Sequence, residues 1–207
     1  MVFKQRPARP STEKTYNTKF NSFVAPGPKH TFQVDSFNFN YEQKVNFKKN
    51  PPPPHGLVCV DVFTKQVQIV PLYDKTAASW KNDLDKLIAK MGRPQNIMAN
   101  PDASITSIEV DEWFRRNKDI RHITTRHHAA FAERALREFK QIMYKKLNKR
   151  RRWTDYLPEV LERMNTGKQS DRVDDDKVYP HAATGFLPEE AAKPENWFEV
   201  HNNLDSS

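Results

Sequence analysis

The stretch GLVCVDVFTKQVQIVPL, residues 56 to 72, determines the centre of the predicted fold. Its first half, residues 56 to 63, is a nearly continuous apolar run, which is typical of a strand buried on both faces of a sheet. Its second half, residues 66 to 72, alternates apolar and polar side chains as a half-buried strand does. Because only Thr64 and Lys65 separate the two halves, the stretch predicts a β-hairpin.

Upstream of this hairpin, the run HTFQVDSFNF (30–39) is rich in Phe and Val and predicts another strand, with Asp35 inside it. The four prolines at 51–54 cannot form regular structure. Residues 1–29 carry six Lys or Arg against one acidic residue, Glu13, and have few apolar side chains. We expect them to form a flexible basic arm.

Downstream of the hairpin, the apolar spacing becomes helical. Residues 76–91 carry one apolar stripe, and Gly92 follows where a C-terminal cap belongs. Short strands are predicted at 95–99 and 120–125, and helices at 107–117, 127–146, 153–165 and 187–192. In the helix at 153–165, Thr154 is the expected N-cap. The expected apolar stripe of the helix at 107–117 is Ile108, Val110, Trp113 and Phe114.

The element order is therefore three strands followed by alternating helices and strands. This order predicts an α/β domain with a mixed five-stranded sheet and helices on both faces, which is the ribonuclease-H-like fold. We place this core at residues 30–192, between the basic arm at 1–29 and a C-terminal tail at 193–207.

The composition indicates a polyanionic partner. The formal net charge of this 207-residue chain is +8, and residues 126–152 hold ten Lys or Arg against only Glu133 and Glu138. Clustered positive charge favours nucleic acid, whereas a merely solvated surface usually mixes both signs. The single cysteine, Cys59, lies in an apolar run and predicts a buried thiol. No apolar run fits a membrane span or a secretion signal, so we expect an intracellular protein.

The helix at 127–146 combines an acidic head with a basic surface. Glu133, Arg137 and Lys140 share one helical face, while a separate apolar stripe can pack on a core. One interpretation is an ordinary amphipathic helix with a solvated charged face. The other is an enzyme that holds metal ions against a phosphate backbone. Such chemistry needs carboxylates from separate elements. The candidates are Asp35, a residue in ANPDAS (99–104), and Glu133.

Six segments follow one another along the chain: FQVD, GLVCVDVFTKQVQIVPL, GRPQNIMANPD, HITTRHHAAFAERALREFKQIM, WTDYLPEVLERMN and HAATGFLPEEA. In series they resemble the catalytic core of retroviral-type integrases, the DDE recombinase family, and look most similar to integrases of Polinton (Maverick) transposons and virophages. The last segment is similar to the family's H-x-x-T-G-x-x-P-x-x-A ending. Each segment is weak alone, but together they cover most of the chain in the right order.

The resemblance implies a Mg²⁺- or Mn²⁺-dependent polynucleotidyl transferase that processes DNA ends and joins them to target DNA. Asp35 matches the first catalytic aspartate, and Glu133 matches the glutamate. The second aspartate of the family falls eight residues after the glycine that matches Gly92, where this chain has Asn100. The next carboxylate is Asp102, and two residues of extended strand span roughly 6 to 7 Å. The metal ligands expected are thus Asp35, Asn100, Glu133 and, through a shifted loop, Asp102.

Asn100 decides how much activity is expected. Its amide can offer an oxygen to a metal but removes one negative charge from a site for two dications. We expect metal affinity and rate to collapse. Three explanations stay open: an Asp→Asn change introduced for study, natural decay in a domesticated relative, and rescue by Asp102. The competing function is a non-catalytic, domesticated integrase-like subunit with a structural or nucleic-acid-binding role in a larger assembly. A ribonuclease H or resolvase nuclease is a third, weaker match.

The resemblance also implies partners. Double-stranded DNA, both element ends and target, is the expected ligand, and a homo-multimer is expected because two DNA ends must be joined. The expected location is the nucleus or a viral or transposon nucleoprotein complex. Asp61 matches a position that the family usually fills with Asp; a catalytic role is one interpretation, and we favour a buried hydrogen-bonding role near the site. The expected DNA contacts are His128, Arg134, Arg137, Lys140, Lys145, Lys149, Arg150, Arg151 and Arg152.

Overall fold

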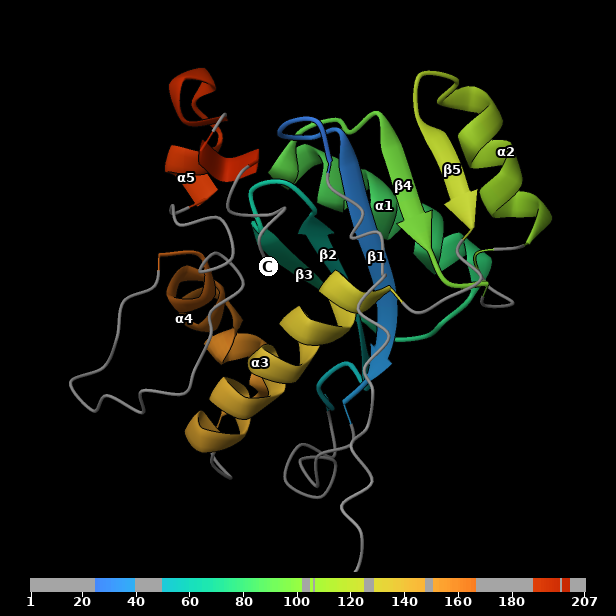
Figure 1. Ribbon diagram of the computed structural model, residues 1–207. Helices are drawn as coiled ribbons and strands as arrows, with labels where there is room; N and C mark the ends of the chain where they lie inside the picture. Colours follow the sequence, from blue (N-terminus) through green and yellow to red (C-terminus); the bar gives the residue numbers. More distant parts are fainter. Residues whose placement is uncertain are drawn as a thin grey trace, which may run out of the picture.

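The computed structural model describes residues 25–39, 50–101, 105, 107–124, 129–147, 151–166, 188–197 and 199–201. These residues form one sheet in the order β3-β2-β1-β4-β5 (Figure 1). The first three strands are antiparallel, and β4 and β5 continue the sheet from β1 in parallel. The strands are β1 (Thr31–Asn38), β2 (His55–Asp61), β3 (Val67–Leu72), β4 (Asn96–Ala99) and β5 (Arg121–Thr124). The predicted hairpin and the predicted mixed five-stranded sheet are both confirmed.

Helices cover both faces of the sheet, as predicted. Figure 1 shows α3 (Ala130–Lys146) in front of the strands and α1 (Ala77–Met91) behind them. α4 (Trp153–Thr166) is drawn beside α3, with which it shares one core. α2 (Ile108–Arg116) packs with α1 on the rear face. The short helix α5 (Pro188–Ala191) and the 3₁₀ turn η3 (Pro194–Asn196) follow near the end of the chain.

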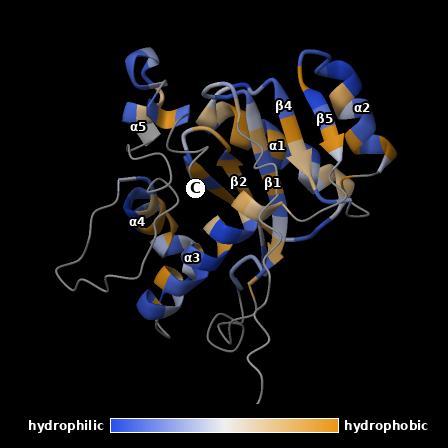
Figure 2. Cartoon of the chain, in the orientation of Figure 1, coloured by the Kyte–Doolittle hydropathy of each residue, from blue (hydrophilic) through white to orange (hydrophobic). Residues whose placement is uncertain are grey.

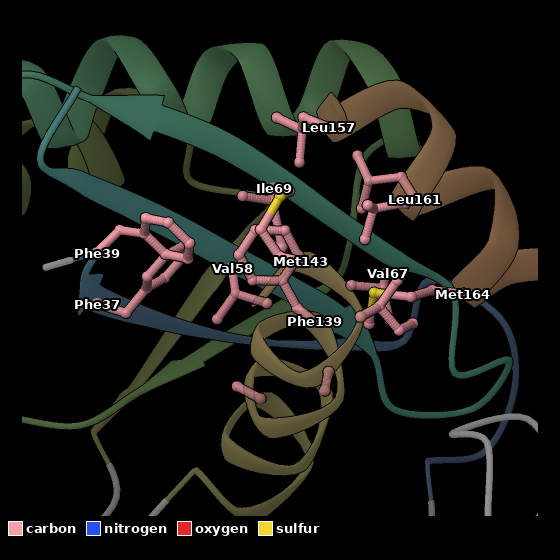
Figure 3. Packing of buried hydrophobic residues seen from close by; sticks show 14 of the residues in the cluster. Phe37, Phe39, Val58, Val67, Ile69, Phe139, Met143, Leu157, Leu161 and Met164 are labelled. Carbon is pink, nitrogen blue, oxygen red and sulfur yellow. The ribbon is translucent and has the colours of Figure 1, made fainter. Parts of the chain in front are cut away.

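Two apolar cores lie on either side of the sheet. The core between the sheet and α3–α4 is shown in Figure 3, where Phe139 and Met143 of α3 lie against Val58 of β2. The second core joins Val34 and Ala99 of the sheet to α1 and α2. In Figure 2, β2 is largely hydrophobic and β1, β4 and β5 mix hydrophobic with hydrophilic residues, whereas much of the visible side of α3 is hydrophilic. In β1, β2 and β3, residues on alternate sides of the strand belong to different cores, whereas β4 contributes only Ile97 and Ala99, both to the second core.

The helix ends explain two corrections. Ile108 is 73% exposed rather than packed. It precedes Val110 by two positions, roughly 200° around the helix, so the two side chains cannot share a face. Thr154 is not the N-cap of α4, because the helix already begins at Trp153. Asp155 Oδ2 instead accepts a hydrogen bond from the Arg152 backbone N at 3.0 Å, the reciprocal half of a capping box.

The start and end of α1 follow the prediction. The Thr76 hydroxyl accepts a hydrogen bond from Ser79 N, and Gly92 ends the helix at a φ of +86°. The left-handed backbone at this position favours glycine, which has no Cβ to strain. The Gly92 N–H also donates to the Ile88 carbonyl, so the last turn of the helix is closed.

A third, small cluster joins the two ends of the described chain to the β2–β3 turn. Phe63 of this turn packs with Ala25, Ala191 and Val200, all fully buried. The His201 ring Nε2 donates to the Pro26 carbonyl at 3.0 Å. Residues on both sides of the expected core therefore pack against it, and its boundaries at 30 and 192 stay a prediction.

Candidate functional site

Strand register places Asp35 and Asn100 next to each other. β1 and β4 run parallel, with Val34 opposite Ala99, and the next residues along the two strands are Asp35 and Asn100. The side chains of Val34 and Ala99 point into the α1–α2 core. Because strand side chains alternate, those of Asp35 and Asn100 belong to the other face, which α3 covers. Both residues are half-buried.

Gln33 holds the amino-terminal end of α3 on this same face. Its side-chain Oε1 accepts hydrogen bonds from the backbone N of Phe131 at 2.9 Å and of Ala132 at 3.3 Å. α3 has Ala129 at its N-cap position and no side-chain cap of its own. The first N–H groups of a helix need partners, so the Gln33 amide, reaching across from β1, does the work of the missing cap.

The contact of Gln33 with the first turn of α3, here called the clamp, positions the turn that carries Glu133. Glu133 lies one residue beyond Ala132, in the first turn of α3, and is half-buried. Gln33 and Asp35 are two residues apart on β1 and therefore share a face. Further along, Phe139 of α3 packs against Phe37 of β1 with ring centroids 5.7 Å apart, so the helix follows the strand. The first turn of α3, which carries Glu133, therefore lies on the same face of the sheet as Asp35 and Asn100, and their joint role as ligands stays a prediction.

The donor set at this place is two carboxylates and one amide. The described residues contain no group of three His, Cys, Asp or Glu side chains that could hold a metal ion. The carboxylates of Asp35 and Glu133, with the Asn100 carbonyl oxygen, are the hard oxygen ligands that Mg²⁺ prefers. They suit one divalent ion better than two, because a second dication needs another negative charge. Asp102, the possible rescue ligand, lies outside the described residues.

The basic side chains of α3 and of the start of α4 are largely at the surface. Arg134, Arg137, Lys145 and Arg151 are exposed, and Lys140 and Arg152 are half-buried. The Arg151 guanidinium stacks 4.5 Å above the ring of Tyr156, which fixes its position. The remaining expected DNA contacts, namely His128, Lys149 and Arg150, lie outside the described residues. Lys146, which was not among them, pairs with Glu159 of α4.

Comparison with known proteins assigns this fold. Neither the models of protein families nor the curated proteins match the sequence. Among solved structures, the HTLV-2 integrase catalytic core domain in complex with magnesium matches in a trimeric form, at a TM-score of 0.58 and 19% identity, over 74% of this chain and 95% of that chain. Its dimeric form matches at 0.57 and 18%, over 71% and 93%. The fold is that of a retroviral integrase catalytic core.

A larger assembly shows the same likeness. A chain of the simian T-cell lymphotropic virus intasome in complex with the PP2A regulatory subunit B56 gamma matches at a TM-score of 0.61 and 21% identity. The match covers 76% of this chain but only 55% of that chain, so it extends over about half the length of the intasome protein. At such identities, the similarity to integrase structures establishes the ribonuclease-H-like fold. The activity has to be inferred from the residues of the site.

Asp61 has the predicted buried hydrogen-bonding role, but not beside Asp35. It is 2% exposed, and its carboxylate accepts hydrogen bonds from the backbone N of Lys29 and of Phe63, each at 2.9 Å. Burial raises the pKa of Asp61, and these hydrogen bonds partly offset the effect. Asp61 is opposite Phe32, three residues before Asp35 on β1, so it stabilises the other end of this strand of the integrase-like core.

Sequence reasoning missed three residues close to α3. Gln33 is the clamp described above, and a polar side chain two positions before Asp35 in an apolar strand was the available signal. Lys65 is 3% exposed, and its Nζ lies 3.7 Å from the centroid of the Phe131 ring. Burial lowers the pKa of Lys65 to about 7. Burial likewise raises the pKa of Glu138 to about 7. Neither shift could be read from the sequence, because both come from packing.

Proposed function

We propose that this chain is an integrase-type core that binds double-stranded DNA and processes and joins DNA ends by phosphoryl transfer, with catalysis weakened by Asn100. The observation that carries the proposal is the strand register, which places Asn100 beside Asp35 on the face where Gln33 anchors the first turn of α3. An integrase-like fold alone would not support a role in DNA joining, because one fold hosts many functions.

Each residue has a distinct role in this proposal. Asp35, Asn100 and Glu133 would hold the metal, which when bound would polarise the scissile phosphate and lower the pKa of an attacking water. Arg134 and Arg137, which are exposed next to Glu133 on α3, would hold the phosphodiester backbone in place. Asn100 supplies an oxygen without charge, and therefore holds a dication less tightly than a carboxylate would. DNA binding does not require that charge, so the chain should bind DNA even where its catalysis is weakened.

The finer expectations from the sequence belong to the same proposal. The similarity to Polinton and virophage integrases, the core at 30–192, and a nuclear or nucleoprotein location are proposed on the six quoted segments. Assembly as a homo-multimer is proposed because the two HTLV-2 core structures are described as dimeric and trimeric, and the simian virus protein as part of an intasome. Within the described residues no helix has the length and apolar character needed to cross a bilayer.

The decisive experiment is Mn²⁺-supported strand transfer on an oligonucleotide end. We expect little or no product from the native chain, product from Asn100→Asp, and its loss in the double variant Asn100→Asp, Glu133→Gln. DNA binding, measured in parallel without metal, should be retained by all three proteins. If Asn100→Asp also yields no product while DNA binding persists, the catalytic proposal is wrong.

The second candidate is a non-catalytic integrase-like subunit with a structural or nucleic-acid-binding role. The observation that favours it is Asn100 itself, because an intact set of three carboxylates would be expected in a working enzyme. The same strand-transfer comparison decides between the two. Silence of all three proteins, together with retained DNA binding, is the result that this second candidate predicts.

A further inference from the structure

A polar pocket lies at the opposite end of the parallel strands from Asp35 and Asn100. Its volume is about 490 Å³. It is formed where β1, β4 and β5 begin, at the upper edge of the sheet in Figure 1. Five residues of β-strand separate His30 from Asp35, roughly 16 Å. The pocket is lined by His30, Gln95, Asn96, Lys118, Asp119 and Arg121.

The only carboxylate in this lining is already compensated. Asp119 accepts hydrogen bonds from the guanidinium of Arg93, one of them from Nη2 at 2.7 Å. These hydrogen bonds lower the pKa of Asp119 to about 2, so it stays ionised and paired. Lys118 and Arg121 are exposed, and neither forms an ion pair with any residue that the structure describes. The pocket therefore carries two uncompensated positive charges.

His30 adds a donor to the same pocket. Its Nδ1 lies 2.9 Å from the Thr31 hydroxyl and 3.5 Å from the side-chain Nδ2 of Asn96. Asn96 Nδ2 can only donate, and it also lies 3.3 Å from the Thr31 hydroxyl oxygen as a donor. The Thr31 hydroxyl hydrogen is thus available to His30 Nδ1. This network assigns the acceptor role to Nδ1 and leaves the hydrogen of the neutral ring on Nε2.

We propose that this pocket binds a phosphate group of the DNA backbone, as a second DNA contact remote from Asp35. Apart from the paired Asp119 carboxylate and the amide oxygens of Gln95 and Asn96, its polar groups are donors: the His30 imidazole N–H, the Gln95 amide N–H groups, an ammonium and a guanidinium. Donors of these types are the usual partners of phosphate oxygens. All six lining residues are polar, whereas an acidic peptide would be expected to find an apolar wall for its side chains.

The position of the pocket explains what a second contact would do. This inference rests on the proposed function, in which one protein must hold an element end and a target duplex together. A contact roughly 16 Å from Asp35 along β1 can hold DNA that is not the DNA being cut. The two contacts would then add to the overall affinity, and each would contribute to its salt dependence.

The test is DNA binding by the full chain in EDTA, over a series of NaCl concentrations, with a short fluorescent duplex. The pocket variant is Lys118→Gln, Arg121→Gln. The control, Lys81→Gln, Lys90→Gln, removes the same charge from α1. We expect the slope of log affinity against log salt to fall by about one in the pocket variant relative to the control, because one phosphate contact contributes about 0.9. Equal slopes in the two variants would overturn the proposal.

Two further measurements identify the source of the anion. NMR signals of the His30 ring should shift with the duplex in the native chain and not in the pocket variant. If inorganic phosphate shifts them but the duplex does not, the pocket serves a small phosphate ligand and the DNA proposal is wrong. If polyglutamate shifts the His30 signals and the duplex does not, the pocket binds an acidic protein and the DNA proposal is wrong. These measurements use neither metal nor turnover, so they can be interpreted even if the chain proves inactive in strand transfer. Equally, a negative result at the pocket would not contradict the proposed catalytic function.

Discussion

Gln33 provides the most direct test of how the site is assembled. Its Oε1 accepts from two backbone N–H groups in the first turn of α3, at 2.9 and 3.3 Å, and the residue is 5% exposed. We consider two substitutions: Gln33→Met removes the acceptor and keeps the side-chain length, while Gln33→Ala removes the side chain as well. Both should loosen the turn of α3 that carries Glu133.

The magnitude follows from the groups left without partners. Losing an N-cap acceptor costs about 1 kcal/mol, and a buried donor left unsatisfied costs about 1 to 3 kcal/mol. Ala132 is fully buried, so water cannot easily replace the lost acceptor there. We therefore expect Gln33→Met to lower the free energy of unfolding by about 1 to 3 kcal/mol, and Gln33→Ala by more, because it also leaves a cavity.

Two measurements check this prediction. Urea unfolding gives the change in the free energy of unfolding, and hydrogen exchange reports on the amides of Phe131 and Ala132. The matched control is Gln68→Met, a half-exposed position on β3, which should change stability by no more than about 0.5 kcal/mol. If Gln33→Met is as stable as this control and both amides stay protected, then Gln33 does not hold α3, and the argument that brings Glu133 to the site fails.

Three other predictions concern polar groups that are buried (Lys65) or half-buried (Glu138 and Asn165). Burial raises the pKa of Glu138 from its ordinary 4.5 to about 7, so the folded protein loses stability as pH rises between these values. Glu138→Gln should therefore gain stability relative to the native chain in thermal melts at pH 8 but not at pH 4, by at most about 3 kcal/mol. Burial lowers the pKa of Lys65 from 10.5 to about 7, so stability should rise with pH across this range. Lys65→Met should flatten that rise, and an unchanged slope would contradict the assignment. Finally, Asn165 of α4 accepts from Val67 N at 2.8 Å and donates to Val67 O at 2.9 Å, pairing with the edge strand β3. Chemical denaturation should show that Asn165→Ala lowers the free energy of unfolding by about 1 to 2 kcal/mol. Asn165→Asp should lie between the native chain and Asn165→Ala, because Asp keeps only the acceptor.

Some elements could be predicted because their signals are local. The hairpin at 56–72 shows its buried and half-buried strands directly in the spacing of apolar residues, and the register confirms it. α1 carries both of its end signals in the chain, with Thr76 before the helix and Gly92 after it. The buried residues of the 107–117 helix were predicted correctly except for Ile108. Ile108 is apolar but faces solvent because of its angular position on the helix.

Other features depend on contacts between segments far apart in the sequence. Gln33 and Phe131 are separated by 98 residues, as are Val67 and Asn165, and nothing local to either pair indicates the other. The pocket at His30 is similar, because it collects residues from the beginnings of three strands. The candidate site residues Asp35 and Glu133 could be proposed from motifs in the sequence, and their role as metal ligands stays a prediction. The structure adds that Asp35 is next to Asn100 across two strands and that the first turn of α3 lies on the same face. The sequence therefore indicates which side chains could carry the chemistry, and the sheet register supplies their arrangement.

Asn100 changes the balance between stability and metal binding, and this gives the last prediction. The proposed metal site of Asp35, Asn100 and Glu133 contains two carboxylates, and Asn100→Asp would add a third. Without metal, like charges repel, so the variant should be less stable than the native chain by on the order of 1 to 2 kcal/mol. With Mn²⁺ the sign should reverse, because the third carboxylate strengthens metal binding, and metal at a hundredfold excess over Kd adds about 2.7 kcal/mol.

Thermal melts in EDTA and in Mn²⁺ measure both effects, with Asn82→Asp on the exposed side of α1 as the matched control. We expect Asn100→Asp to have a lower Tm than the native chain in EDTA and a larger Mn²⁺-induced rise, while the control shows neither change. If Mn²⁺ raises the Tm of Asn100→Asp no more than that of the control, then residue 100 is not beside a metal site. A chain that binds DNA without cutting it loses nothing in folding by keeping Asn100, since the amide avoids a repulsion that only a bound metal would relieve.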